Sequence, residues 1–223
     1  LAVITIEELT ADPHPHLARL RAEAPISWVP ELDAWLVTGR AAAVEVMRDA
    51  ASFTVDDPRF STGRVVGASM LSTDGAVHAR HRSAFAAAFR PATNRERLGT
   101  VVSEIARRRV SEAAALATVD LRATVAGPVA AEVAIVALGL VDTTPADVRG
   151  WYTDIVDAVS ALSIDLEATA APSLMDGIRA AVARTVAKPE TALAATRRDG
   201  DLDDEEFASN VAIVLFGALE TSE

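Results

Sequence analysis

The sequence predicts a mainly α-helical single domain over residues 1–223, with one small β element near its start. Three observations predict this class: helical spacing of apolar residues recurs along most of the chain, turn-forming residues separate the helical segments, and a single stretch has strand character. Half of the 223 residues are hydrophobic, which is sufficient for a sizeable core.

The β element covers residues 26–37, where two apolar segments flank a Pro-Glu-Leu-Asp turn and predict a hairpin. Residues 56–67 are rich in charge and turn formers, so we expect a loop, and residues 197–203 are expected to be a polar break. Helices are expected over residues 16–24, 40–49, 74–89, 94–116, 121–140, 144–162 and 171–187, and from residue 203 to the last residue.

Composition excludes several classes of function. The net charge of −11 argues against a nucleic-acid partner, and the absence of cysteine excludes disulfides and thiolate metal sites within these residues. The four histidines form no metal motif, and the start lacks the features of a signal peptide. The apolar stretch 124–141 is shorter than the ~20 residues of a membrane span. We therefore expect a cytoplasmic protein without a membrane segment.

His78 and Arg82 are the first candidate binding residues. They lie four residues apart in a helical run, so both side chains project from one face, one turn apart. Two nitrogen donors in that arrangement suit an anionic group such as a carboxylate. The alternative is a solvated basic face; it is disfavoured by the Met-Leu entry, the turn over 72–75 and the Pro91 stop.

The last helix is the second candidate. Residues 207–219 are apolar nearly all round, which is typical of a helix in the centre of a large protein, and no earlier segment is expected to be available to cover it. We expect the sequence to stop in mid-helix, with much of the core missing. Thr221 lies four residues after Gly217, so its hydroxyl can bond that carbonyl and open a groove where Glu220 relays protons. The alternative is a polar helix end at a solvent boundary.

Together these segments resemble the cytochrome P450 family of haem-thiolate monooxygenases. His78 and Arg82 are similar to the His and Arg of the family's C helix that hold the haem propionates. Residues 217–222 resemble the small-Gly-x-acid-Thr-Thr groove of the I helix, with Ala218 in place of Gly and Ser222 in place of the second Thr. Residues 33–49 resemble the early strand and B helix, and residues 119–140 resemble the stretch that includes the E helix.

The resemblance implies the amino-terminal part of a soluble bacterial P450 fold, helices A to part of I, with no metal ligand in this chain and the iron-binding Cys beyond residue 223. It implies haem b and insertion of one oxygen atom from O2 into an apolar small molecule, by the complete protein and not by this chain alone. The implied residues are His78, Arg82, Met70, Gly217 and Ala218 for haem binding, Glu220 and Thr221 for proton delivery, and Val66, Ile213 and Phe216 for substrate binding.

The resemblance also implies a ferredoxin-type electron donor, for which Arg80, His81 and Arg90 are candidate docking charges. The alternative, an ordinary solvated side chain, is favoured for each of them. Two other functions stay open. One is a non-catalytic relative that has lost its thiolate and activates a partner enzyme such as a glycosyltransferase. The other is an unrelated helical ligand-binding module whose last helix is covered by a partner.

Overall fold

The computed structural model of the chain describes residues 4–165 and 167–222, and the side chains of residues 91–93 also lie outside the description. Its internal contacts divide the chain into two compact units, Leu1–Thr54 and Val55–Glu223, which are described separately. The single domain over residues 1–223 stays a prediction.

The first unit is built around the predicted hairpin, which the structure confirms. Strands β1 (Ile26–Val29) and β2 (Ala34–Val37) pair antiparallel across the short 3-10 turn η1 (Pro30–Leu32). Trp28 lies opposite Trp35, with ring centroids 5.4 Å apart. The remaining elements of this unit are α1 (Ile6–Ala11), α2 (Pro13–Glu23) and α3 (Arg40–Arg48).

Helix α1 was not among the expected elements. Thr5 caps it: its hydroxyl accepts a hydrogen bond from the Glu8 amide, while the Glu8 carboxylate accepts from the Thr5 amide. This reciprocal capping box satisfies two amides that the first turn leaves unpaired. The Thr-x-x-Glu pattern was the sequence signal that could have identified the helix.

The second unit is helical, as predicted, and its described residues contain no strand. A short π-helical turn, η2, precedes α7, and a 3-10 turn, η3, precedes α9. The elements are α4 (Ser61–Val66), α5 (Gly75–Ala86), α6 (Pro91–Ala114), η2 (Arg122–Ala126), α7 (Gly127–Leu138), α8 (Pro145–Ile164), η3 (Pro172–Met175), α9 (Asp176–Val186), α10 (Ala192–Asp199) and α11 (Asp204–Glu220).

The structure differs from the expected secondary structure of this unit in two places. Residues 61–66 of the expected loop form α4, because Thr62, Val65 and Val66 are buried and the helix packs against α8 and α11. The expected break at residues 197–203 begins inside α10, which Thr191 caps by accepting from the Ala194 amide. In both places a short helix with one buried face is too polar overall for its periodicity to stand out.

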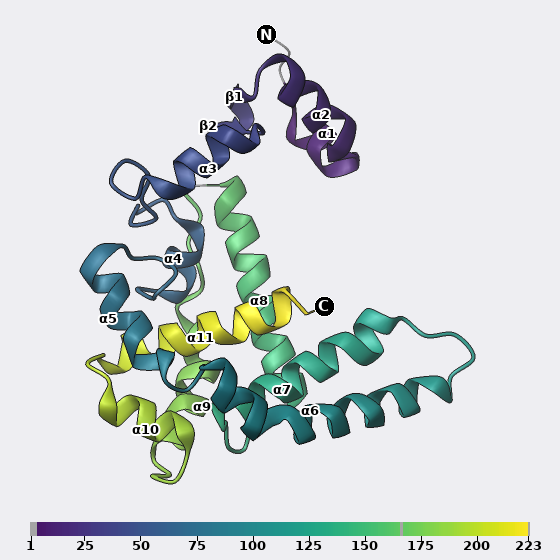
Figure 1. Cartoon of the computed structure of the whole chain (residues 1–223), viewed down its shortest axis with the longest axis vertical. Coiled ribbons are helices and arrows are strands. Elements are labelled where there is room, and N and C mark those ends of the chain that lie inside the picture. The colour runs from purple at the N-terminus through teal and green to yellow at the C-terminus, as the bar shows by residue number, and fades with distance from the viewer. Residues whose placement is uncertain (1–3, 166, 223) are drawn as a thin grey trace. The chain divides into compact units, whose positions relative to one another are not determined.

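Helix α11 forms the centre of the second unit, as its apolar character predicted. It contacts α4, α7, α8 and α9, and Figure 1 shows it running among them. The expectation that no earlier segment could cover it was therefore wrong. Its buried residues are Phe207, Ala208, Ser209, Asn210, Val211, Ala212, Ile213, Leu215 and Leu219. Residue 223, to which the predicted helix extended, lies outside the described residues.

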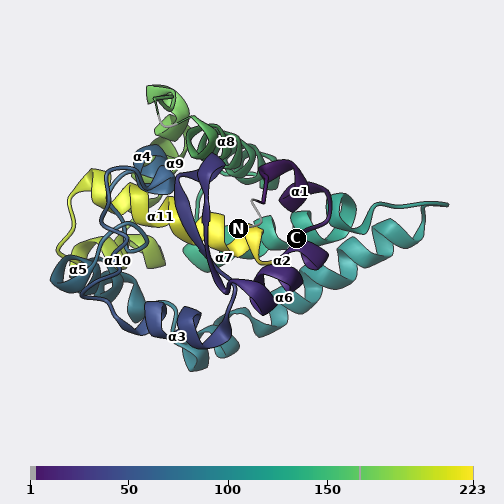
Figure 2. The same cartoon turned by 90° about the horizontal axis from the view of Figure 1, so that it is seen from above.

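Helices α6 and α7 pack side by side and extend away from the rest of their unit (Figures 1 and 2). Glu132, the charged residue within the apolar run of α7, accepts hydrogen bonds from Arg108 and Arg109 of α6.

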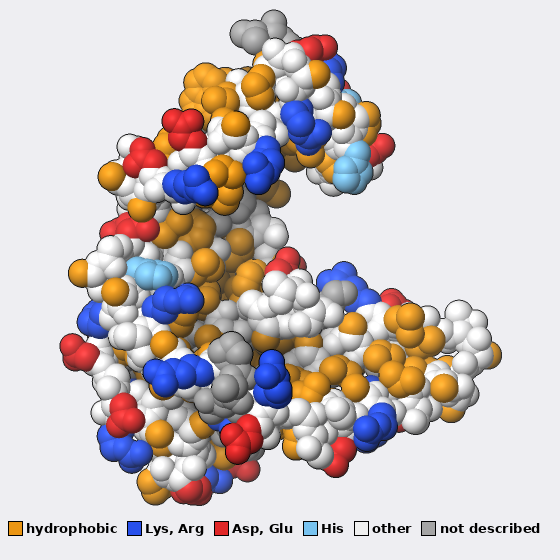
Figure 3. Space-filling model, viewed as in Figure 1, with side chains coloured by type: hydrophobic (Ala, Val, Ile, Leu, Met, Phe, Trp, Pro, Cys, Tyr) orange, Lys and Arg blue, Asp and Glu red, His pale blue; other side chains and the backbone are white. Residues whose placement is uncertain are grey.

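Within the described residues, no helix is both long and apolar enough to cross a membrane. Figure 3 shows hydrophobic side chains gathered over the pair of helices α6 and α7. Val110 of α6, Val136 of α7, and Leu116 and Leu121 between the two helices are exposed.

Trp151 of α8 lies against Gly177 of α9. A Cβ atom added at Gly177 would lie 2.3 Å from the Trp151 indole nitrogen. We expect Gly177→Ala to lower the free energy of unfolding by about 1–3 kcal/mol, because the ring must move from its packed position. A urea titration measures this change. Gly99→Ala in α6, where the added methyl meets no described atom within 4 Å, is the control and should raise stability by about 0.5–1 kcal/mol. Equal effects of the two substitutions would contradict the packing argument.

Candidate functional site

Helix α5 carries His78 and Arg82 on one face, as the spacing predicted. Its amino-terminal cap, Asp74, holds the preceding segment by accepting hydrogen bonds from the amides of Val55 and Asp56, at 2.7 and 3.1 Å. Arg82 is exposed and makes no hydrogen bond or ion pair with any residue that the structure describes. Its guanidinium is therefore available to a ligand.

His78 is half-buried, and its ring is held at one nitrogen. Nδ1 lies 2.8 Å from the carbonyl oxygen of Met70. Because a carbonyl can only accept, the geometry assigns the proton to Nδ1. The other ring nitrogen, Nε2, can then donate to an anion only when the imidazole is protonated. His78 and Arg82 together would thus present two cationic donors to an acidic ligand.

Met70 is held from its other side by Asn210 of α11. The Met70 amide donates to Asn210 Oδ1 at 2.8 Å, and Asn210 is completely buried. Asn210 Nδ2 donates to the carbonyl of Glu206 at 2.7 Å and to His81 Nδ1 at 2.8 Å. The sequence prediction missed Asn210; the signal was a single amide side chain within the apolar run 207–219.

The expected docking role of His81 was wrong, while that of Arg80, which is half-buried, stays a prediction. His81 is 0% exposed, and its Nε2 lies 3.4 Å from the Glu206 carboxylate. Arg80 makes two hydrogen bonds to that carboxylate and a third to the Asp201 carbonyl. Both side chains thus fasten α5 to the start of α11. Arg90 is exposed, and its docking role stays a prediction.

The end of α11 has the arrangement that the Gly217–Thr221 spacing predicted. The Thr221 hydroxyl donates to the Gly217 carbonyl at 2.7 Å, and a Cβ at Gly217 would meet no described atom within 4 Å. Glu220 is exposed and accepts a hydrogen bond from the Tyr152 hydroxyl of α8. The Tyr152 ring also contacts Phe216, with centroids 5.7 Å apart. Tyr152 was not among the predicted site residues.

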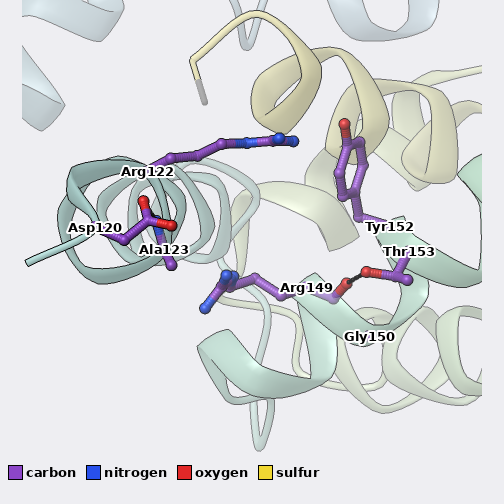
Figure 4. Close-up of a pocket in the computed structure, with 7 residues that line it drawn as sticks. All are labelled: Asp120, Arg122, Ala123, Arg149, Gly150, Tyr152 and Thr153. Carbon is purple, nitrogen blue, oxygen red and sulfur yellow. Dashed lines mark hydrogen bonds between the residues drawn. The ribbon is translucent and has the colours of Figure 1, made fainter.

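A pocket of about 450 Å³ lies beside this helix end. Figure 4 shows the Tyr152 side chain extending from α8 toward α11, with Arg122 and Arg149 on the pocket wall. None of the predicted substrate-binding residues lines this pocket. Its full lining is Asp120, Arg122, Ala123, Arg149, Gly150, Tyr152 and Thr153.

The predicted substrate-binding residues come from two helices in contact, α4 and α11. Val66 is 3% exposed and Ile213 is 9% exposed, while Phe216 is half-buried. Ser209 joins the two helices by donating to the Val66 carbonyl at 2.5 Å. Their role toward a substrate stays a prediction, as does the role of Ala218, which is half-buried beside Gly217.

Comparisons with known proteins find chains of similar sequence and fold. No family model matches the chain. A curated protein named cytochrome P450 123, from Mycobacterium bovis and from Mycobacterium tuberculosis, is 28% identical over 228 aligned positions, covering 95% of this chain and 56% of the relative. Among solved structures, CalO2 aligns with a TM-score of 0.75 at 22% identity, over 99% of this chain and 60% of CalO2. The structure of P450BioI in complex with an acyl carrier protein bearing hexadec-9Z-enoic acid aligns with a TM-score of 0.72 at 18% identity, over 97% of this chain and 60% of P450BioI.

The predicted fold and resemblance are thereby confirmed: the chain has the fold of the amino-terminal part of a cytochrome P450. Its sequence resembles that family along nearly its whole length, and it spans about 56% of the curated relatives that it matches.

Glu206, Arg80, His81 and Asn210 form a polar cluster between α5 and α11. Through the Glu206 carboxylate, this cluster makes the stability of the fold depend on pH. Hydrogen bonds from Arg80 lower the pKa of Glu206 from its usual 4.5 to about 2, although burial acts in the opposite direction. A carboxylate with a lowered pKa stabilises the folded state above the unfolded value, and this stabilisation disappears as the pH falls. We expect the free energy of unfolding to decrease between about pH 4.5 and pH 2 in part through this group.

The test compares Glu206→Gln with wild type by denaturant titration across this pH window. We expect the variant to be less stable than wild type at pH 7 and to lose less stability on acidification. Glu104→Gln in α6 is the control, because Glu104 is exposed and has no ion pair among the described residues. Parallel pH profiles for wild type and Glu206→Gln would show that the Arg80–Glu206 contact does not stabilise the fold.

Proposed function

We propose that this chain forms the propionate-binding and proton-delivering part of a haem-dependent monooxygenase. One observation carries the proposal: in a P450 fold, the Met70 carbonyl holds His78 Nδ1 and leaves Nε2 for a ligand, beside the unpartnered Arg82 of the same helix face. With a protonated imidazole this pair suits an anionic ligand, and the described residues supply no anionic partner for Arg82.

The chemistry of the donors fits haem b. Its two propionates are carboxylates, which form charge-assisted hydrogen bonds with an imidazolium and with a guanidinium. Arg82 is the better bidentate donor, since its planar fork matches the two oxygens of a carboxylate. Met70 would act through its backbone, by holding His78, and Gly217 and Ala218 would leave room beside α11 for the group.

When bound, haem supplies the activation of dioxygen and the transfer of one oxygen atom to the substrate. The chain contains no cysteine, so these residues cannot provide an axial thiolate. We infer that the thiolate comes from the part of the P450 fold that this chain does not span.

Glu220 and Thr221 are the groups proposed to hold and move protons. The Thr221 hydroxyl donates its hydrogen bond to the Gly217 carbonyl. The lone pairs of Thr221 Oγ1 are therefore free to accept a hydrogen bond. Glu220 is exposed to solvent, and the Tyr152 hydroxyl fixes the direction of its carboxylate. A solvent proton taken up at the carboxylate could then pass toward Thr221 Oγ1.

The proposed substrate is an apolar small molecule, since Val66, Ile213 and Phe216 are apolar side chains of adjacent helices. The proposed electron donor is a ferredoxin-type protein. A cytoplasmic location and the absence of a nucleic-acid partner stay predictions from the composition, where the net charge is −11.

The test is a reduced carbon-monoxide difference spectrum of the intact gene product. We expect a red-shifted Soret band, which is the signature of thiolate-ligated haem iron. We also expect the double substitution His78→Ala with Arg82→Ala to leave most of the protein without haem, because both cationic partners of the propionates are removed.

The control replaces the same residue types at exposed positions, His14→Ala with Arg107→Ala, and should keep full haem occupancy. Absence of the band in wild type would contradict the proposed function. Equal occupancy in the two double variants would contradict only the role of His78 and Arg82.

Thr221→Ala tests proton delivery. We expect reductant consumption to continue while product falls and hydrogen peroxide rises, by about 10-fold or more in the ratio of peroxide to product, because a positioned proton donor contributes about 10²–10⁴-fold. Product, peroxide and reductant are measured in the same reaction. Thr221→Ser retains the hydroxyl and should retain most of the coupling. Tight coupling in Thr221→Ala would refute the assignment.

A further inference from the structure

We propose that Asn210 is a positioning residue that orients His78 for its carboxylate ligand through the backbone of Met70. The inference rests on the proposed function, because it assigns a residue that acts on the same binding site. Asn210 itself lies inside α11 and would not touch the ligand.

Two hydrogen bonds and the backbone of Met70 connect Asn210 to His78. Asn210 Oδ1 accepts from the Met70 amide at 2.8 Å, and the Met70 carbonyl accepts from His78 Nδ1 at 2.8 Å. Met70 therefore has both of its backbone polar groups committed, one to each partner. A change at Asn210 reaches His78 through a single peptide unit.

The orientation of the Asn210 amide is fixed by its partners. The Met70 amide can only donate, so the atom facing it must be Oδ1. The two Nδ2 hydrogens then go to the Glu206 carbonyl and to His81 Nδ1. Because Asn210 is 0% exposed, removing its side chain leaves the Met70 amide and the Glu206 carbonyl without this partner in the interior of the protein.

Neighbouring bonds do not replace this support. The Ser69 amide donates to Ser72 Oγ at 3.0 Å, and the Ser69 carbonyl accepts from the Thr73 hydroxyl at 2.8 Å. Those contacts hold the turn at Ser69, while the Met70 amide and carbonyl depend on Asn210 and His78. On the other side of Met70, the Leu71 amide donates to Ser69 Oγ at 3.3 Å. Asn210 is thus the contact through which α11 adds to the support of Met70 and, through it, of the His78 ring.

The substitutions separate positioning from simple packing. Asn210→Asp keeps an oxygen acceptor for the Met70 amide and loses the donors to His81 and to the Glu206 carbonyl, so it tests the acceptor separately from the two donors. Asn210→Leu has a similar size and lacks the acceptor. Asn210→Ala is a second variant without the acceptor, and it serves if the Leu variant does not fold.

The experiment measures the rate at which the haem-loaded intact gene product loses its cofactor to excess apomyoglobin. Each variant is loaded with haem b or, in parallel, with haem dimethyl ester, whose propionates are neutral. We expect Asn210→Leu and Asn210→Ala to lose haem b about tenfold faster than wild type, as His78→Ala does, because a charge-assisted bond is weakened. Haem dimethyl ester should leave wild type and these variants at the same rate.

Two further results are expected. Asn210→Ala combined with His78→Ala should lose haem b no faster than His78→Ala alone, because both changes remove one contact. Asn210→Asp should lose haem b more slowly than Asn210→Leu and Asn210→Ala, because it alone of the three keeps the acceptor for the Met70 amide. Ser209→Ala is the matched control, since it removes the adjacent bond from α11 to Val66, and it should leave the rate unchanged.

The outcomes distinguish this inference from the proposed function. If His78→Ala accelerates loss of haem b and the Asn210 variants do not, the inference alone is overturned. If the Asn210 variants accelerate loss of haem b and of its dimethyl ester equally, their role is structural and the inference is overturned. If His78→Ala has no effect, His78 does not hold a propionate and the inference is overturned together with that assignment.

Discussion

The burial of α11 is the constraint on which the second unit depends. The helix is apolar nearly all round, so it is stable in water only when other elements cover most of its surface. Helices α4, α7, α8 and α9 provide this cover. The polar side chains that α11 carries are also buried, Asn210 completely and Glu206 in large part. Those groups must then be satisfied inside the protein, because unpaired buried polar groups are costly.

Helix α5 satisfies them, and this fixes its position on α11. Arg80 neutralises Glu206, and His81 Nδ1 accepts from Asn210. Phe85 stacks on Phe207, with ring centroids 5.3 Å apart, so apolar packing supports the same contact. His81 and His78 lie on one helix in opposite environments. Both ring nitrogens of His81 face buried partners, whereas His78 keeps Nε2 for a ligand. The polar cluster thus holds the candidate binding residues without taking part in binding.

The two ends of α11 have different tasks in the proposed function. Near its start, Asn210 and Glu206 hold the α5 side of the site. At its end, the Thr221 hydroxyl bonds the Gly217 carbonyl, and Tyr152 of α8 holds Glu220. A single buried helix therefore links the groups proposed to bind the carboxylates of haem with the groups proposed to deliver protons.

The sequence by itself determined the elements whose signals are local. Two strand-like segments around a tight turn specify the hairpin, Thr144 and Pro145 specify the start of α8, and the spacing of His78 and Arg82 places them on one helix face. Thr221 could be assigned its bond to Gly217 because both atoms lie within one helical turn. These features depend on residues a few positions apart, where chain geometry leaves few alternatives.

Only the tertiary structure decided the features that join distant segments. Helix α4 exists because α8 and α11 cover its apolar face, and Arg80 and His81 differ from solvated basic residues only because Glu206 and Asn210 lie beside them. Tyr152 meets Glu220 across 68 positions of sequence. A side chain's charge and polarity are written in the sequence, whereas its burial and its partner are set by which helices pack together.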